Sequence, residues 1–275
     1  MKIFKKIRDG NKRTIILFGV IKIKYRKREQ ANYISINELK SHIDIEELIE
    51  HIAIHSKVAA HHGAVFEKYR NIYNNRDIVI CGTGETLQDY KPINNTVNIG
   101  INRAFRTKKI KFDYLFVQDL FPEGMDEFIK YRPNQCKKMF AMPSYSRMRK
   151  NSSVHSVPLS VINRAKGEYF FMDSRNQFRF AFDPTVEPIG DFDFTAMVAL
   201  QFALFTNPRR IYLVGMDCTN NFFYGSGSNH DYQKTIWHKF AEFARINFPE
   251  TEFISVNPVG LKGLFKDLYQ KKDEK

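Results

Sequence analysis

Short apolar runs alternate with segments of helical spacing from residue 77 onward. Short runs bounded by turn residues are typical of buried strands, and apolar residues three or four positions apart are typical of helices. The alternation predicts an α/β fold with a doubly wound, mostly parallel, Rossmann-like sheet. The predicted strands are 77–81, 96–101, 113–118, 138–142, 168–172, 210–215 and 252–256, and the predicted helices are 85–90, 123–130, 194–206, 232–247 and 261–270.

The first part of the chain follows other patterns. Residues 14–25 predict two short strands joined near Phe18-Gly19, and residues 21–26 alternate apolar and basic positions, which is typical of a half-buried strand in a basic hairpin. Residues 37–73 carry apolar residues at helical spacing. We therefore expect a basic N-terminal hairpin and helical appendage over 1–75, followed by a Rossmann-like domain over 76–275.

The ends of the first three predicted strands carry small and amide residues. The first strand runs into Gly82-Thr83-Gly84, the second ends at Asn102 and the third at Gln118. The carboxyl ends of parallel strands meet at one edge of a sheet, and glycine lets the backbone approach a phosphate closely. This arrangement predicts a nucleotide site, with a tight turn that has no ligand as the structural alternative.

Two positions depart from the dinucleotide fingerprint. Leu87 stands where a third glycine is expected, and Asn102, followed by Arg103, stands where an acidic residue would hold a ribose. An amide both donates and accepts hydrogen bonds, so it suits a base edge, a ribose or a phosphate. The pattern disfavours NAD and favours a mononucleotide-linked ligand.

A second polar segment follows the strand predicted at 210–215. That strand ends in Gly215-Met216-Asp217, and the following Gly/Ser/Asn loop carries Tyr224 and His230. Histidine titrates near neutrality, which makes His230 a candidate general base. Asp217 would orient a ribose or the histidine. The alternatives are a helix-entry role for His230 and a backbone-capping role for Asp217.

Cysteine and histidine spacing does not predict a metal site. Cys81, Cys136 and Cys218 are far apart in the sequence, and reduced thiols are expected. His51 and His55 are one helical turn apart, but no third ligand lies nearby in the sequence. A solvated or packing face is favoured over metal binding.

Charge is concentrated at the N-terminus. The chain has a net charge of +13, and residues 1–28 contain eleven Lys or Arg and one acid. Such a segment binds anionic lipid, at about 1 kcal/mol per basic residue near the surface, or nucleic acid. No nucleic-acid motif accompanies it, so a membrane surface is favoured, with a solvated hairpin edge as the alternative. No apolar run is long enough to span a bilayer, and no signal-peptide pattern is present.

Segments 77–87, 97–105 and 210–217 resemble the bacterial sialyltransferases of glycosyltransferase family 42. They also resemble the related 6-hydroxymethylpterin diphosphokinase-like domains of motility accessory factors. In that family the motifs G-N-G-P-S-L and C-N hold the CMP part of CMP-sialic acid, and the matching residues here are Gly82, Thr83, Gly84, Thr86 and Leu87, and then Asn102. The family has an Asn on its third strand, and Gln118 stands near that position. The family's base is a His in the loop after the strand I-Y-L-S-G-I-D, and IYLVGMD followed by His230 matches that layout.

The chain departs from that family at two phosphate-binding positions. The arginine expected before the helix at 194–206 is absent from the segment GDFDFTAM. Thr219 stands at the first of two tyrosine positions that steady the leaving phosphate, and Tyr224 matches the second. Arg103 and Arg147 are the candidates to replace the missing arginine.

The resemblance implies a metal-independent glycosyltransferase of bacterial lipopolysaccharide or capsule synthesis. Its donor would be CMP-sialic acid or another CMP-nonulosonate, its acceptor a glycan or glycolipid, and it would require no cofactor. The protein would be cytoplasmic and would bind the inner membrane peripherally through residues 1–28. Nucleic acid is not expected as a partner, and a homo-oligomer is an open alternative. The alternatives are a pterin-type diphosphokinase, using ATP and Mg²⁺ with Asp119 and Asp217, and an inactive nucleotide-fold assembly module.

Overall fold

The computed structural model divides the chain into two compact units, Met1–His51 and Ile52–Lys275. In the first, strands β1 (Phe4–Asp9), β2 (Lys12–Leu17) and β3 (Ile21–Arg26) pair antiparallel in that order. The domain boundary expected at residue 75 stays a prediction. The residues that the structure describes are 4–9, 12–17, 21–26, 45–121, 123–143, 157–173, 179–192, 194–226 and 232–270.

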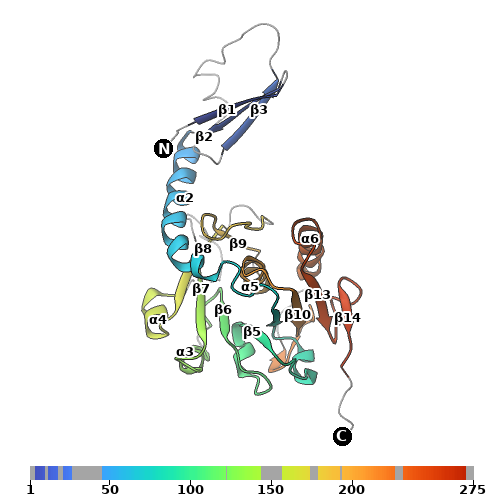
Figure 1. Ribbon diagram of the computed structural model, residues 1–275. Coiled ribbons are helices and arrows are strands. Elements are labelled where there is room, and N and C mark those ends of the chain that lie inside the picture. Colours follow the sequence, from blue (N-terminus) through green and yellow to red (C-terminus); the bar gives the residue numbers. More distant parts are fainter. Residues whose placement is uncertain are drawn as a thin grey trace. The chain divides into compact units, whose positions relative to one another are not determined.

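The second unit is built on a nine-stranded, all-parallel sheet of order β14-β13-β10-β4-β5-β6-β7-β8-β9 (Figure 1). It confirms the α/β, Rossmann-like class. The strands are β4 (Asp77–Cys81), β5 (Thr96–Ile101), β6 (Tyr114–Val117), β7 (Lys137–Pro143), β8 (Glu168–Asp173), β9 (Ile189–Gly190), β10 (Arg210–Val214), β13 (Glu252–Val256) and β14 (Lys266–Leu268). A separate pair, β11 (Asn221–Phe222) and β12 (Gly225–Ser226), is antiparallel.

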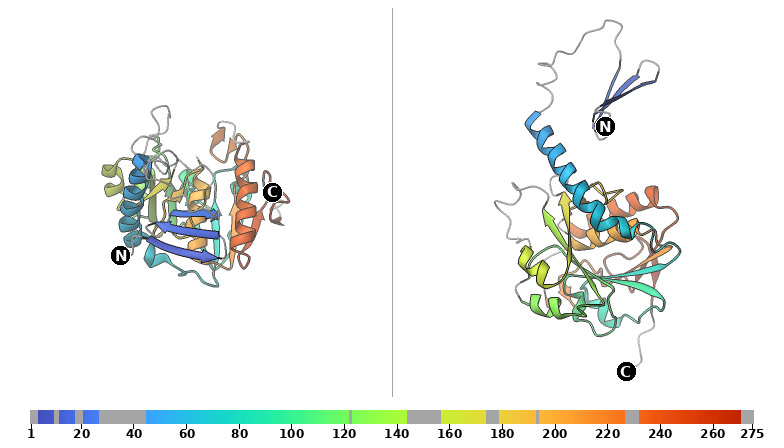
Figure 2. Two further views of the ribbon diagram at one scale, coloured as in Figure 1. Left: turned by 90° about the horizontal axis from the view of Figure 1, so that it is seen from above. Right: turned by 60° about the vertical axis from the view of Figure 1, so that its left-hand side comes forward.

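Helical elements cover both faces of the sheet (Figure 2). Alternate strand residues point to opposite faces, so Ile78 and Ile80 join one core while Val79 and Cys81 join the other. The first core includes residues from α2, α5 and α6, and the second includes residues from α3 and α4. The helical elements are α2 (Ile45–Phe66), η1 (Glu67–Tyr69), η2 (Glu85–Asp89), η3 (Asn102–Arg106), α3 (Met125–Lys130), α4 (Leu159–Arg164), α5 (Thr195–Phe205) and α6 (Tyr232–Asn247).

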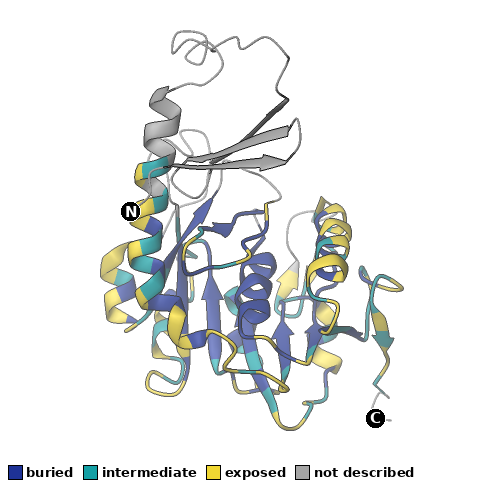
Figure 3. Ribbon diagram, turned by 45° about the horizontal axis from the view of Figure 1, so that its top comes forward, coloured by how far each residue is buried: buried dark blue, intermediate teal, exposed yellow. Residues whose placement is uncertain are grey.

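Helix α5 is buried along its whole length, whereas α6 has an exposed face (Figure 3). A helix that is apolar on all sides is typical of a protein core. In the described part of the chain no helix combines the length and apolar character needed to cross a bilayer.

The prediction of a helix at 261–270 is wrong. Residues 266–268 instead form β14, which pairs with β13. Gly263 has a left-handed φ of 74°, and its amide donates to the carboxylate of Asp267 at 3.2 Å. That conformation interrupts a helix. The helix expected at 85–90 is the shorter 3₁₀ helix η2, and the short strand β9 was not predicted.

The order of the strands reverses at β4. The chain proceeds from β4 through β9 on one side, then returns to place β10 on the other side of β4. In open α/β sheets ligands bind outside the carboxyl ends of the strands at such a switch point. The topology therefore points to the carboxyl ends of β4 and β10.

Candidate functional site

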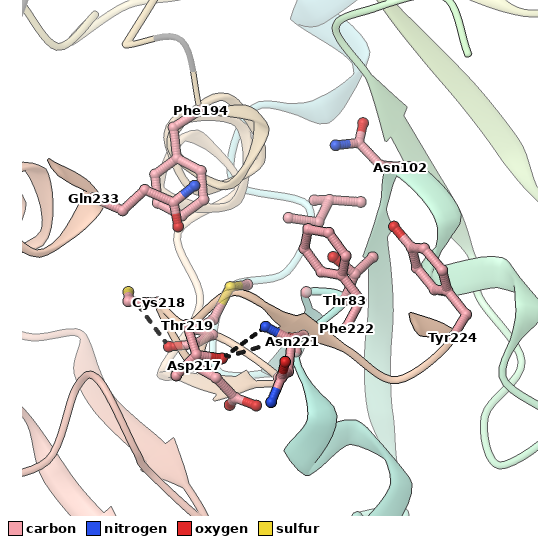
Figure 4. A pocket seen from close by; sticks show the side chains of 15 residues that line it. Thr83, Asn102, Phe194, Asp217, Cys218, Thr219, Asn221, Phe222, Tyr224 and Gln233 are labelled. Atoms are coloured by element: carbon pink, nitrogen blue, oxygen red, sulfur yellow. Dashed lines mark hydrogen bonds between the residues drawn. The ribbon is translucent and has the colours of Figure 1, made fainter. Parts of the chain in front are cut away.

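A cavity of about 140 Å³ lies at this switch point (Figure 4). Residues that follow β4, β5 and β10 line it, together with Phe194 before α5 and Gln233 in the first turn of α6. The structure thus brings together six of the residues singled out in the sequence. They are Gly82, Thr83, Gly84, Asn102, Asp217 and Tyr224.

The two glycines pack the turn after β4 against the loop after β10. The amides of Gly82 and Gly84 donate to the carbonyl oxygens of Val214 and Gly215, both at 2.8 Å. A Cβ atom added at Gly82 would lie 2.4 Å from Gly215 O, and one at Gly84 would lie 2.5 Å from the Asp217 Cγ. The absence of a side chain at these glycines thus lets the loop after β10 approach the turn closely, and both glycine amides already have acceptors within the protein.

Asp217 is buried, with 4 % of its surface exposed, and holds the start of η2. Its carboxylate accepts hydrogen bonds from Thr86 N at 2.8 Å and Thr86 Oγ1 at 2.5 Å, and from the backbone of Glu85. Burial raises the pKa of Asp217, and the hydrogen bonds from Thr86 oppose that rise. Asp217 therefore has the backbone-capping role named as its alternative, and a direct catalytic role stays a prediction.

Asn102 directly follows β5 in a left-handed conformation with φ of 48° and lines the cavity. Behind it lies a buried polar chain. The Thr195 hydroxyl is 3.4 Å from Asn102 Oδ1 and 3.5 Å from Gln118 Oε1, and Gln118 Nε2 donates to Asp191 Oδ1 at 2.7 Å. Gln118 and Thr86 do not line the cavity. Gln118 contacts Asn102 through Thr195, and Thr86 donates to Asp217.

An aromatic group forms another part of the site. The rings of Phe222 and Tyr224 stack with centroids 5.3 Å apart and an interplanar angle of 15°. The guanidinium carbon of Arg103 lies 5.6 Å from the centroid of Tyr224 and 5.4 Å from that of Phe121. Sequence reasoning missed Phe222, although it is the first residue of the aromatic run that ends at Tyr224.

Sequence reasoning also missed Thr195, Phe194 and Gln233. They lie at the starts of two helices, where the sequence pattern marks a boundary but not the direction of a side chain. His230 and Arg147 lie outside the described residues, so their roles stay predictions.

The described residues contain no group of three or more His, Cys, Asp or Glu side chains placed to hold a metal ion. The three cysteines are buried free thiols.

No protein-family model matches this chain, and no curated protein matches it in sequence. Similar solved structures include those of a sialyltransferase. The sialyltransferase CST-II in complex with a trisaccharide acceptor and CMP shares 13% identity over 73% of this chain and 88% of that chain, with a TM-score of 0.43. CstII from Campylobacter jejuni with CMP shares 14% identity over 66% of this chain and 80% of its own, with a TM-score of 0.31.

CstII with CMP-3FNeuAc shares 13% identity over 70% of this chain and 85% of its own, with a TM-score of 0.34. The chain is thus similar in structure to a bacterial sialyltransferase, at low sequence identity. Similarity at this level carries no residue roles and no activity over to this chain.

Proposed function

We propose that this protein is a glycosyltransferase that uses a nucleotide-linked sugar. The donor is CMP-sialic acid or another CMP-nonulosonate, and the acceptor is a bacterial surface glycan or glycolipid. The observation that carries the proposal is the switch-point cavity, where Thr83, Asn102 and Tyr224 come together from three separate loops. No acidic residue stands at the end of β5, where a dinucleotide site would hold a ribose.

The cavity is large enough for one nucleobase ring. A cavity of roughly 150 Å³ accommodates one six-membered aromatic ring, and this one measures about 140 Å³. Its apolar wall includes Phe194 and Phe222, and its polar wall includes Thr83 and Asn102.

The proposed reaction exchanges one C–O bond for another. The acceptor hydroxyl oxygen bonds to the anomeric carbon of the sugar, the bond from that carbon to the donor phosphate oxygen breaks, and CMP leaves with the bonding electron pair. His230 takes the proton of the acceptor hydroxyl as general base. Asn102 binds the nucleotide, Gln118 supports Asn102 through Thr195, and Asp217 holds the loop that carries Thr86. A metal ion and a separate cofactor are not required by this scheme.

Ligand binding to the full-length chain tests the donor class. A bound ligand raises stability by mass action, so CMP is expected to raise the unfolding temperature without added metal, and more than UMP or AMP does. Thermal unfolding with CMP, UMP, AMP and ATP, each with and without Mg²⁺, measures this. Stabilisation by ATP and Mg²⁺ alone would instead support the pterin-type diphosphokinase.

We also propose that residues 1–28 bind an anionic membrane surface at the cytoplasmic face of the inner membrane. Their eleven basic residues and one acid support this. Deletion of residues 1–28 is expected to leave CMP binding intact and to weaken co-sedimentation with vesicles that contain anionic lipid. Equal co-sedimentation of both proteins at low salt would contradict the membrane role.

A further inference from the structure

The glycine turn after β4 is poorly suited to bind an anion. The amides of Gly82 and Gly84 donate to carbonyl oxygens of the protein, and the Asp217 carboxylate accepts from the first residues of η2. In many nucleotide sites a phosphate takes the position at a helix start that this carboxylate occupies. An anionic substrate at this cavity therefore needs positive charge from another element.

Arg103 is placed to supply that charge. No Lys or Arg occurs among the described residues that line the cavity. Arg103 directly follows the lining residue Asn102, and its guanidinium contacts the ring of Tyr224, which also lines the cavity. Its second ring contact, with Phe121, orients the guanidinium without neutralising it.

The hydrogen bonds of Arg103 are incomplete. Nη2 donates to Glu123 O at a long distance of 3.4 Å, and the buried Nε has no hydrogen-bond partner in the part of the chain that the structure describes. By contrast Arg106, on the same 3₁₀ helix, is paired with Glu127 at 3.0 Å. A buried donor without a partner is destabilising, so an acceptor supplied by a ligand would explain why Arg103 is held in this way.

We propose that Arg103 binds an oxyanion of the substrate, either the donor phosphate or the carboxylate of a nonulosonate sugar. The identity of the substrate rests on the proposed function. A guanidinium forms two parallel hydrogen bonds with either group. Phe121 and Tyr224 position the guanidinium, so the anion site lies after β5 and not at the glycine turn after β4.

The test compares Arg103→Gln and Arg103→Lys with a matched control, Arg106→Gln, in the full-length protein. Calorimetry at low salt measures binding of cytidine, CMP, N-acetylneuraminate and inorganic pyrophosphate. Charged hydrogen bonds of this kind correspond to about a 10- to 100-fold change in affinity, and Arg103→Gln is expected to lose that factor for the oxyanion. Binding of cytidine should not change, and Arg106→Gln should match the wild type for every probe.

The pattern of losses identifies the source of the anion. A loss for CMP identifies the phosphate, and a loss for N-acetylneuraminate identifies the carboxylate. Arg103→Lys should recover only part of the loss, because an ammonium group cannot form the two-point contact. If the wild type binds pyrophosphate through Arg103 but no cytidine ligand, the proposed donor is wrong and the anion site stands.

If the wild type and Arg103→Gln have equal affinity for each of the four probes, or if neither protein binds any of them, the assignment of Arg103 is overturned. Thermal unfolding of each variant shows whether it is folded. If Arg103→Gln does not fold, the wild type and Arg103→Lys decide: CMP affinity that is independent of salt and equal in both proteins would also overturn it.

Discussion

The amino ends of β4, β10 and β13 are joined by ion pairs, whereas the carboxyl ends of β4 and β10 lead into the candidate site. Asp77, which begins β4, accepts from Arg209 at 3.0 and 3.1 Å and lies 3.5 Å from a nitrogen of Arg210. Glu252, which begins β13, accepts from Arg210 at 2.9 Å and from Lys266 at 2.6 Å. These residues tie neighbouring strands together at one edge of the sheet.

At the carboxyl ends of β4, β5 and β10 two charged side chains are in unusual surroundings. Asp217 is buried with a raised pKa, and Arg103 has a buried nitrogen without a hydrogen-bond partner among the described residues. Groups with a shifted pKa and groups without a hydrogen-bond partner are frequent where ligands bind. The comparison indicates that the amino edge stabilises the sheet and that the carboxyl edge keeps groups for a ligand.

The largest effect is expected at His230, the proposed general base. His230→Ala should lower turnover by roughly 10²- to 10⁴-fold with little change in CMP affinity, because the acceptor hydroxyl loses its base. Steady-state kinetics and calorimetry measure the two quantities. The activity of the wild type should also fall at acidic pH, because a protonated imidazole cannot accept the proton of the acceptor hydroxyl.

His238→Ala is the control, since His238 lies exposed on α6. Near-normal turnover of His230→Ala on the true acceptor would show that the base is another residue.

A smaller but still severe effect is expected at the glycine turn. Gly84→Ala would place a Cβ 2.5 Å from Asp217 Cγ and 2.8 Å from Gly215 O. Overpacking of this kind costs about 1–3 kcal/mol of stability, and separation of the two loops should also abolish CMP binding. Urea unfolding and calorimetry measure the two losses.

The matched control is Gly63→Ala in helix α2, where an added Cβ meets nothing within 4 Å. It should be neutral or stabilising by about 0.5–1 kcal/mol. A Gly84→Ala protein that binds CMP normally would contradict the packing role given to this glycine.

His62 is buried away from both edges of the sheet, and both of its ring nitrogens have hydrogen-bond partners. It therefore allows a test of how stability depends on pH. His62 Nδ1 donates to the carbonyl oxygens of Pro184 (2.8 Å) and Glu187 (3.0 Å), and Nε2 accepts from Phe171 N at 2.7 Å. Burial lowers the pKa of His62 from 6.5 to about 4. The unfolded chain therefore binds a proton that the folded chain excludes between these pH values.

Stability should fall by about 3 kcal/mol as the pH drops from about 6.5 to 4, and this contribution should be constant above pH 6.5. Urea unfolding as a function of pH measures this loss of stability, and the loss should be absent from His62→Gln. An NMR titration of the wild type provides a check that needs no variant. A His62 ring that titrates near pH 6.5 in the folded protein would refute this account.

The smallest effect is expected at the amino edge. Asp77→Asn should cost about 1 kcal/mol or less, because ion pairs near the surface contribute little and are screened by salt. CMP affinity should not change. Urea unfolding at low and high salt measures the first effect, and a change in CMP affinity would mean that the two edges are coupled.

The local pattern of the sequence was sufficient for most of the sheet. β4, β5 and β13 have the predicted bounds. Helices cover both faces of the parallel sheet, so its strands are buried on both sides and are recognisable in the sequence as short, nearly continuous apolar runs. The same reasoning failed at 261–270, where apolar spacing resembles a helix. The left-handed Gly263 and the pairing of β14 with β13 decided that segment.

The sequence by itself also located the candidate site, because glycine and amide residues at strand ends mark the carboxyl edge of a parallel sheet. Only the tertiary structure decided what those residues contact. Thr86 and Asp217 are 131 positions apart and meet because β10 returns to pair with β4. Arg103 meets Tyr224 for a similar reason, since the loop after β10 reaches across to η3. Contacts between distant segments depend on strand order, which local propensity does not encode.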